Sequence, residues 1–130
     1  MSAENLELLR QANDRFLATG ELDRELLDDD VVIRDHDIPD TRDYHGPADF
    51  GRWLEDWGEA WAEWTIEPEE YVDAGDKVVF VFRMTAKGRG SGLEVDRHDA
   101  MVYEFRDGKV IAVDYYNSRE QGLVAAGVAG

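Results

Sequence analysis

Residues 77–117, KVVFVFRMTAKGRGSGLEVDRHDAMVYEFRDGKVIAVDYYN, decide the fold that this sequence predicts. Three runs in this stretch, 78–87, 93–106 and 110–116, carry the apolar or alternating pattern that is typical of β-strands. A glycine-rich segment separates the first two runs, and Asp107-Gly108 favours a tight hairpin between the second and the third. We therefore expect three long antiparallel strands, around which the other segments fold.

The segments before this stretch favour helices. Residues 4–19 place apolar side chains at three- and four-residue steps and end at Gly20, in the position of a C-cap glycine. A second short helix is predicted over 21–27. The three aspartates 28–30 follow it, and we interpret them as a solvated helix end, because no spaced ligand loop surrounds them as a metal site would need.

Gly46-Pro47 favours the start of the longest helix, because proline is well placed in a first helical turn. The apolar stripe of this helix is predicted to carry all four tryptophans. Most of them are expected in the core, whereas Trp53 and Trp57 are our candidates for the wall of a pocket. The predicted stripe consists of Phe50, Trp53, Leu54, Trp57, Ala60, Trp61 and Trp64.

The remaining segments complete an α+β layout. Residues 31–36 and 65–73 are predicted strands, and Ser118 with Gln121 forms a capping box for a short C-terminal helix. Helices come first and antiparallel strands last. We expect one domain over residues 1–130: a curved antiparallel (mixed) sheet, wrapped by three N-terminal helices that form a cone-shaped pocket.

The composition excludes several classes of function. The net charge of −16 disfavours binding to nucleic acid or to anionic membranes. The chain has no cysteine, so disulfide and thiolate chemistry are excluded. The N-terminus lacks the pattern of a signal peptide, and no apolar run approaches the roughly 18 residues of a membrane span. We expect a soluble cytoplasmic protein without a metal or a cofactor.

Two charged residues occupy strand positions that favour apolar side chains. Asp35 continues the apolar face of Val31 and Ile33, and it is either a turn-former before Ile38-Pro39 or a buried acid. Arg83 lies in the middle of a strand, where its charge requires a carboxylate partner.

The later strands supply further candidates. If no bulge intervenes, one face of 93–106 carries Arg97, Asp99, Met101, Tyr103 and Phe105, with His98 opposite; a single bulge would exchange His98 and Asp99. In the last strand, Ala112, Asp114 and Tyr116 alternate against Ile111, Val113 and Tyr115. An apolar patch for a homodimer is predicted from His98, Val102, Ile111, Val113 and Tyr115.

Four segments carry a resemblance to a known family: VVIRDHD (31–37), YHGPADFGRWL (44–54), DAGDKVVFVFR (73–83) and FRDGKVIAVDYYNSRE (105–120). With them the chain resembles the SnoaL-like branch of the nuclear-transport-factor-2-like superfamily, a cystatin-like α+β cone that includes ketosteroid isomerases. The resemblance covers nearly all 130 residues and implies pairing of two sheets through their open faces. It leaves the activity open, because isomerases, cyclases, dehydratases, epoxide hydrolases and non-enzymatic binders share this scaffold.

Comparison with the isomerases assigns one catalytic group and no oxyanion hole. Asp35 matches the catalytic base that these enzymes place at the end of the first strand. The donors of their oxyanion hole match Phe16 and Met101, neither of which donates a hydrogen bond. Steroid isomerisation is therefore not expected.

Comparison with two other enzyme groups gives incomplete matches. The epoxide hydrolases use an Asp–Arg–Asp arrangement, in which Asp114 and Arg83 match, but Thr85 stands where the second carboxylate should follow the arginine by two residues. Asp35 or Asp99 are possible substitutes. The polyketide cyclases use a last-strand acid, again matched by Asp114, with a histidine whose position falls near Met101.

These matches leave alternatives from different classes. The chain is a cofactor-independent isomerase, cyclase or hydratase-type enzyme with Asp35, Asp114 and Arg83 as catalytic groups, or it binds a small apolar molecule without catalysis. In the second case, Arg83 and Asp114 form a structural ion pair. A third alternative is a dimerisation domain whose cavity is filled by side chains. The ligand-binding candidates are Phe16, Trp53, Trp57, Arg97, Asp99, Met101, Tyr103 and Tyr116.

Overall fold

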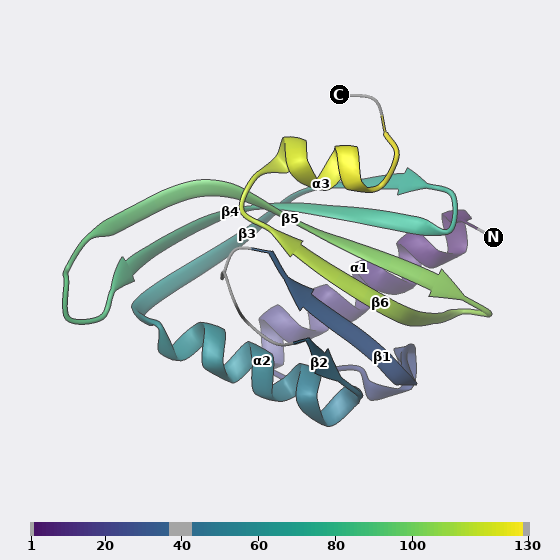
Figure 1. The fold of residues 1–130 in the computed structure, drawn as a ribbon, viewed down its shortest axis with the longest axis horizontal. Helices are drawn as coiled ribbons and strands as arrows, with labels where there is room; N and C mark the ends of the chain where they lie inside the picture. Colours follow the sequence, from purple (N-terminus) through teal and green to yellow (C-terminus); the bar gives the residue numbers. More distant parts are fainter. Residues whose placement is uncertain (1, 37–42, 129–130) are drawn as a thin grey trace.

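The computed structural model describes residues 2–36 and 43–128 and contains one curved six-stranded sheet (Figure 1). The strand order is β2-β1-β6-β5-β4-β3. Neighbouring strands are antiparallel except β1 and β6, which run parallel. The strands are β1 Leu27–Asp35, β2 Tyr44–His45, β3 Trp61–Ala74, β4 Lys77–Gly88, β5 Glu94–Arg106 and β6 Lys109–Tyr116. The predicted α+β class and the mixed sheet are confirmed.

Helices lie on both faces of the sheet. Helix α1 (Ser2–Thr19) and helix α2 (Pro47–Glu59) cover its inner face, and helix α3 (Arg119–Ala125) lies on the outer face (Figure 1). Ser118 caps α3 by accepting a hydrogen bond from the Gln121 amide, as predicted. Helix α3 approaches the sheet closely, because a Cβ atom added at Gly122 would lie 2.5 Å from the Cβ of Ala100.

Each face of the sheet has its own apolar core. The larger core lies between the inner face and the helices α1 and α2, and its centre includes Leu9, Ile33 and Phe82. The smaller core lies under α3. It consists of Val79, Val81, Ala100, Val102 and Leu123.

The structure corrects two predicted helices. The helix expected over 21–27 is a single 3-10 turn, η1 (Arg24–Leu26), because the chain enters β1 at Leu27. The aspartates 28–30 therefore belong to β1 and are not a helix end. The tryptophan helix also ends earlier than predicted, at Glu59, and α1 is longer, at 18 residues against 13.

The residues beyond Glu59 form a strand because they pair with β4. Trp61 faces Gly88, and Trp64 faces Ala86 in the register of β3 against β4. The tryptophan spacing fits a helix, but the ladder that continues to Ala74 determines the local structure. Only Trp53 and Trp57 lie on α2. Ile38-Pro39, the predicted turn after β1, lies outside the described residues.

The two faces of the last strand are exchanged relative to the prediction. Val113 and Tyr115 are buried in the inner core, whereas Tyr116 packs against the outer one. An irregularity between Glu104 and Phe105 shifts the register against β6, so that Val110 and Val113 both belong to the inner core despite their odd spacing. The predicted dimer patch is therefore wrong in its composition. Homodimer formation itself stays a prediction.

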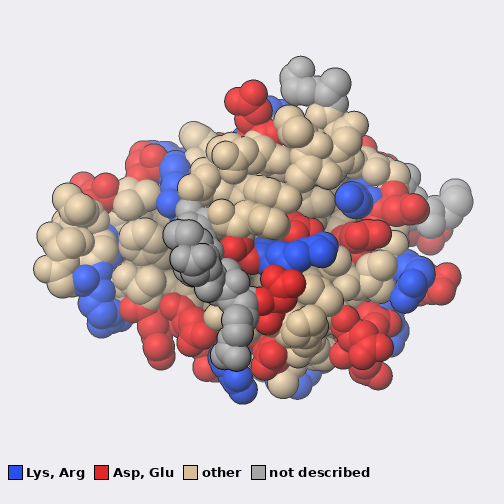
Figure 2. Space-filling view, viewed as in Figure 1, with Lys and Arg blue, Asp and Glu red and all other residues tan. Residues whose placement is uncertain are grey.

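Charge is distributed unevenly over the outer face. Figure 2 shows acidic side chains around the margin of this view, acidic and basic side chains together in its middle, and a mostly uncharged area over α3. Within residues 2–36 and 43–128, no helix is both long and apolar enough to cross a membrane. The same ranges contain no group of three or more side chains that are arranged to hold a metal ion.

Candidate functional site

An apolar cavity of about 80 Å³ lies between α1, α2 and the inner face of the sheet. Phe16, Met101 and Tyr103, three of the predicted ligand-binding residues, lie in its wall. The cavity exists because α1 and α2 span a concave sheet without filling it. The full wall consists of Leu9, Ala12, Asn13, Phe16, Leu17, Leu22, Asp23, Leu26, Leu27, Phe50, Leu54, Ile66, Phe80, Phe82, Met101, Tyr103 and Val110.

An open groove adjoins this cavity at the surface. The groove passes between the end of α1, the turn η1, helix α2 and strand β3, and Trp64 forms part of its side. Trp64 is 41% exposed, which is unusual for an indole. The groove and the cavity share Phe16, Leu17, Leu22, Leu54 and Ile66. These shared side chains therefore belong to the boundary between the two spaces.

Tyr103 contributes a polar group to this mostly apolar wall. Its side chain is buried, and its hydroxyl donates to the sulfur of Met101 at 3.6 Å. Burial raises the pKa of this hydroxyl well above its ordinary value, with a smaller contribution from Tyr71. The group is therefore a neutral donor at physiological pH.

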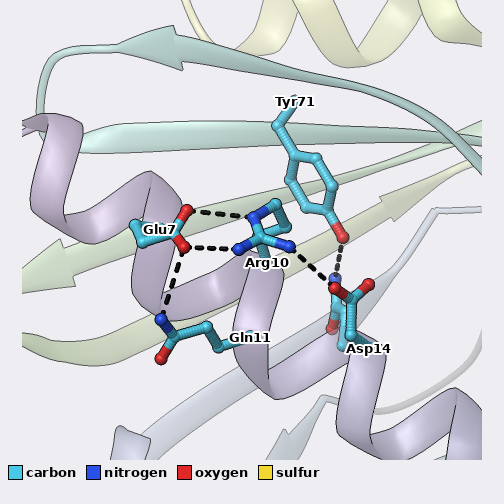
Figure 3. A network of polar contacts seen from close by, with 6 residues as sticks. Glu7, Arg10, Gln11, Asp14 and Tyr71 are labelled. Atoms are coloured by element: carbon cyan, nitrogen blue, oxygen red, sulfur yellow. Dashed lines mark hydrogen bonds and ion pairs between the residues drawn. The ribbon is translucent and has the colours of Figure 1, made fainter.

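One polar contact links α1 to the sheet beside the cavity, and several others lie within the helix. Arg10 donates hydrogen bonds to Glu7 and to Asp14, the latter at 2.9 Å (Figure 3). The Asn13 amide donates to the Tyr71 hydroxyl on β3 at 3.3 Å. The pairs of Arg10 are exposed, so each contributes little to stability. The Asn13–Tyr71 bond has more consequence for the site, because it links a cavity-wall residue to the edge strand.

A buried polar cluster lies beside the cavity on the same face of the sheet. Asp99 of β5 is 0% exposed; the Nε of Arg97 lies 2.7 Å from its Oδ1, and Tyr115 of β6 donates to its Oδ2. Asp35, at the end of β1, is 5% exposed and accepts a hydrogen bond of 2.8 Å from Trp53. Asp35 is thus a buried acid, the second of its two predicted alternatives.

The cluster and the cavity are separated by two phenylalanines. Phe82 lines the cavity, and its ring centroid lies 6.3 Å from that of Tyr115. Phe50 also lines the cavity and packs edge-on against Trp53 at 5.9 Å. Trp53 and Trp57, which we expected in the pocket wall, lie behind this pair and pack against Tyr115.

The structure does not bring Asp114 and Arg83 together. Asp114 lies on the outer face, where Arg34 donates two hydrogen bonds to it, at 2.8 and 3.1 Å. Arg83 binds Asp96 on the neighbouring strand, at 2.7 and 2.9 Å. The predicted Arg83–Asp114 pair is therefore wrong, because β5 lies between the two strands and the carboxylate of Asp96 is nearer.

Tyr116 also lies away from the cavity. Its ring stacks on His36 at 4.5 Å, and the His36 Nε2 lies 2.8 Å from Asp114. Of the two carboxylates proposed for catalysis, only Asp35 lies on the inner face. The arrangement can hold an apolar molecule in the cavity, with a separate group of buried acids next to it.

Comparisons with known proteins agree with this architecture. The profile of a family described as SnoaL-like domain matches residues 10–113. The chain belongs to the SnoaL-like family. No curated protein matches it in sequence.

Solved structures similar to this SnoaL-like chain have the same fold. A SnoaL-like polyketide cyclase, so named provisionally, from Jannaschia sp. CCS1 is 22% identical, with a TM-score of 0.71 over 99% of this chain and 94% of that one. A nuclear-transport-factor-2-like protein of unknown function from Burkholderia pseudomallei K96243 is 16% identical, with a TM-score of 0.68 over 93% and 95%. A hypothetical protein with a ketosteroid isomerase-like fold from Catenulispora acidiphila DSM 44928, in complex with trimethylamine, is 17% identical, with a TM-score of 0.63 over 82% and 80%. These likenesses show the fold alone.

Sequence reasoning missed one part of the polar cluster of this SnoaL-like domain. Tyr115 was assigned to the outer face, because the irregularity between β5 and β6 leaves no mark in the alternating pattern of the last strand. A usable signal existed for the other two residues. Arg97 and Asp99 form the arginine and carboxylate pair, two residues apart, that the epoxide hydrolase resemblance implies, whereas Arg83 is followed at this spacing by Thr85, which has no carboxylate.

Alkaline pH is expected to destabilise the SnoaL-like domain through its buried tyrosines. Burial, and for Tyr115 also the charge of Asp99, raises the pKa of Tyr103 and Tyr115. The unfolded chain therefore loses these protons first, and above pH 10 each tyrosine should lower the free energy of unfolding by about 1.4 kcal/mol per pH unit. Urea unfolding between pH 8 and 11 measures this slope. In Tyr103→Phe the free energy of unfolding should fall less steeply with pH. An unchanged slope would contradict the raised pKa of Tyr103.

Proposed function

We propose that this SnoaL-like protein binds a small apolar molecule in the cavity between α1, α2 and the inner face of the sheet. The observation that carries the proposal is the cavity itself, an apolar space that adjoins an open groove. Protein interiors are normally packed without such spaces, because an empty cavity forfeits dispersion contacts. A pocket that is apolar and contains few polar groups is the usual form of a small-molecule site.

The charge distribution supports a neutral ligand. Among the described residues, the wall contains one carboxyl group, that of Asp23, and no lysine or arginine. An anionic ligand would lose its hydration without gaining an ion pair, and the net charge of −16 would repel it. Nucleic acid and membrane surfaces are disfavoured for the same reason.

A screen of small ketones, lactones, epoxides and polycyclic aromatics tests the proposal. A ligand at one hundred times its Kd should stabilise the folded protein by about 2.7 kcal/mol, visible as an increase in Tm. Ala12 lines the cavity, so Ala12→Phe should fill it and abolish the increase. Ala18→Phe, at an exposed position on the same helix, is the matched control and should leave binding intact. Binding that survives Ala12→Phe would place the ligand elsewhere.

A second candidate function is acid–base catalysis by the buried cluster. The observation that favours it is the complete burial of Asp99, whose carboxylate contacts Arg97 and Tyr115. A charged group is costly to bury, and such groups often belong to catalytic sites. Asp35 lies on the parallel strand next to Tyr115 and would provide a second acid. In this case the ligand would displace Phe50 or Phe82 and reach the carboxylates.

The same compounds distinguish the two candidates. Catalysis would appear in NMR spectra as exchange of protons next to a carbonyl in heavy water, or as hydration of an epoxide. General acid–base groups typically contribute 10²- to 10⁴-fold, so Asp35→Asn should reduce such a rate by a similar factor. Binding without any exchange or hydration would leave the protein a binder and the polar cluster a structural feature.

A further inference from the structure

The hydroxyl of Tyr103 has a weak hydrogen bond in a place where a strong one is needed. Within residues 2–36 and 43–128, the Met101 sulfur is its only partner, at 3.6 Å. A thioether is a weak acceptor, and a buried hydroxyl without a good acceptor is destabilising. The side chains of Tyr103 and Met101 both line the cavity.

Another tyrosine on the inner face, Tyr115, shows the contrast. Tyr115 donates to a fully buried carboxylate, the strongest kind of acceptor that a side chain offers. The Tyr115 hydroxyl therefore donates its proton to Asp99 and not to a ligand. Tyr103 has no carboxylate or carbonyl acceptor among the described residues, which leaves its hydroxyl available to a molecule in the cavity.

We propose that the Tyr103 hydroxyl selects ligands that carry a carbonyl or ether oxygen on an otherwise apolar body. This inference rests on the proposed binding function and specifies its ligand class. An acceptor oxygen in the cavity gives Tyr103 a better partner than sulfur, whereas a pure hydrocarbon leaves the weak bond in place. An anion is disfavoured, because the described part of the cavity wall provides no lysine or arginine to pair with it.

The space available limits the ligand to a small ring system. A cavity of 150 Å³ in another protein accommodates benzene, so about 80 Å³ holds only part of a bicyclic molecule. The adjoining groove, which shares the side chains of Leu17 and Leu54 with the cavity, provides room for the rest. A bicyclic ketone therefore has the size and the chemistry that the site favours.

A pair of isosteric probes tests the selection. 1-Tetralone carries a carbonyl group, and 1-methylenetetralin replaces its oxygen with a methylene group of similar shape. Calorimetry should show that the wild type binds the ketone about tenfold more tightly than the hydrocarbon, the difference expected for one hydrogen bond. Tyr103→Phe should abolish this preference, because it should weaken the binding of the ketone and leave that of the hydrocarbon unchanged.

Two further measurements separate recognition from a packing effect. Met101→Leu removes the sulfur acceptor but keeps the hydroxyl, so the preference for the ketone should persist. The infrared carbonyl band of bound tetralone should lie at lower frequency in the wild type than in Tyr103→Phe, because a donor weakens the C=O bond. A role of Tyr103 in packing alone would leave this band unchanged.

The possible outcomes are distinct. If both probes bind the wild type equally and Tyr103→Phe changes neither, the cavity binds ligands but the inference about Tyr103 is wrong. If neither probe binds, and no compound of the wider screen binds either, both the proposed function and the inference about Tyr103 are wrong. If tetralin-1-carboxylate binds more tightly than the ketone, the neutral-acceptor selection is overturned while the cavity remains the binding site.

Discussion

Arg97→Met is expected to lower the free energy of unfolding by about 3–5 kcal/mol, the largest effect that a single charged residue of this chain should show. The guanidinium lies 2.7 Å from Asp99, whose side chain has no contact with solvent. Arg97→Met removes the cation that lies against this buried carboxylate, while the Tyr115 hydroxyl still donates to it. Urea unfolding monitored by circular dichroism measures the loss.

The chain provides a matched control for this substitution. Arg83→Met breaks an ion pair with Asp96 of similar length, but both of these side chains are exposed, at 43% and 57%. Its expected cost is below about 1 kcal/mol. The double variant Arg97→Met/Asp99→Leu should recover much of the stability that Arg97→Met loses, since replacing both partners of a buried pair by apolar groups is often tolerated. An equal loss of unfolding free energy in Arg83→Met and Arg97→Met would show that burial does not determine the cost of breaking these ion pairs.

The contrast between these two arginines shows what the sequence predicted and what it left undetermined. The requirement of Arg83 for a carboxylate followed from its position within a strand, and a partner is present. The choice of Asp96 over Asp114 depended on strand order, which places β5 between β4 and β6. No spacing rule within one chain segment contains that information. The burial of Asp99 beside Tyr115 likewise depends on the register of two strands.

The fold itself was largely predictable from local patterns. The hairpin at Asp107-Gly108 and the faces of β5 follow from turn chemistry and from strict alternation, and the structure has both. The boundary between α2 and β3 was not predictable in this way. Trp53, Trp57, Trp61 and Trp64 recur at helical spacing, yet pairing with β4 draws the last two into a strand. Tertiary contacts override local periodicity at such boundaries.

The cavity was predicted in part for a related reason. Phe16, Met101 and Tyr103 were identified as wall residues from their faces and from the family resemblance, and they lie there. Neither Phe50 nor Phe82, which separate the cavity from the acids, was among the predicted wall residues. Their position between two functional candidates is a property of three packed elements, α2, β4 and β6, and appears only when these are assembled.

Phe82→Ala is the substitution that should change this separation most. Phe82 is 1% exposed, so its truncation should lower the free energy of unfolding by about 3–5 kcal/mol. It should also extend the cavity towards Tyr115, because the removed ring is the one that stands between them. Toluene should then stabilise the variant more than it stabilises the wild type, whose cavity of about 80 Å³ is small for an aromatic ring.

Phe105→Ala provides the control for this prediction. Phe105 is as deeply placed in the inner core, at 4% exposed, but it does not line the cavity. Its truncation should cost a similar 3–5 kcal/mol and gain little from toluene, whereas Phe82→Ala should regain about 2.7 kcal/mol at one hundred times the Kd. Urea unfolding of both variants with and without toluene makes the comparison. If toluene stabilises neither variant, the inner core collapses around the lost ring, and the cavity and the acids remain separated by other side chains.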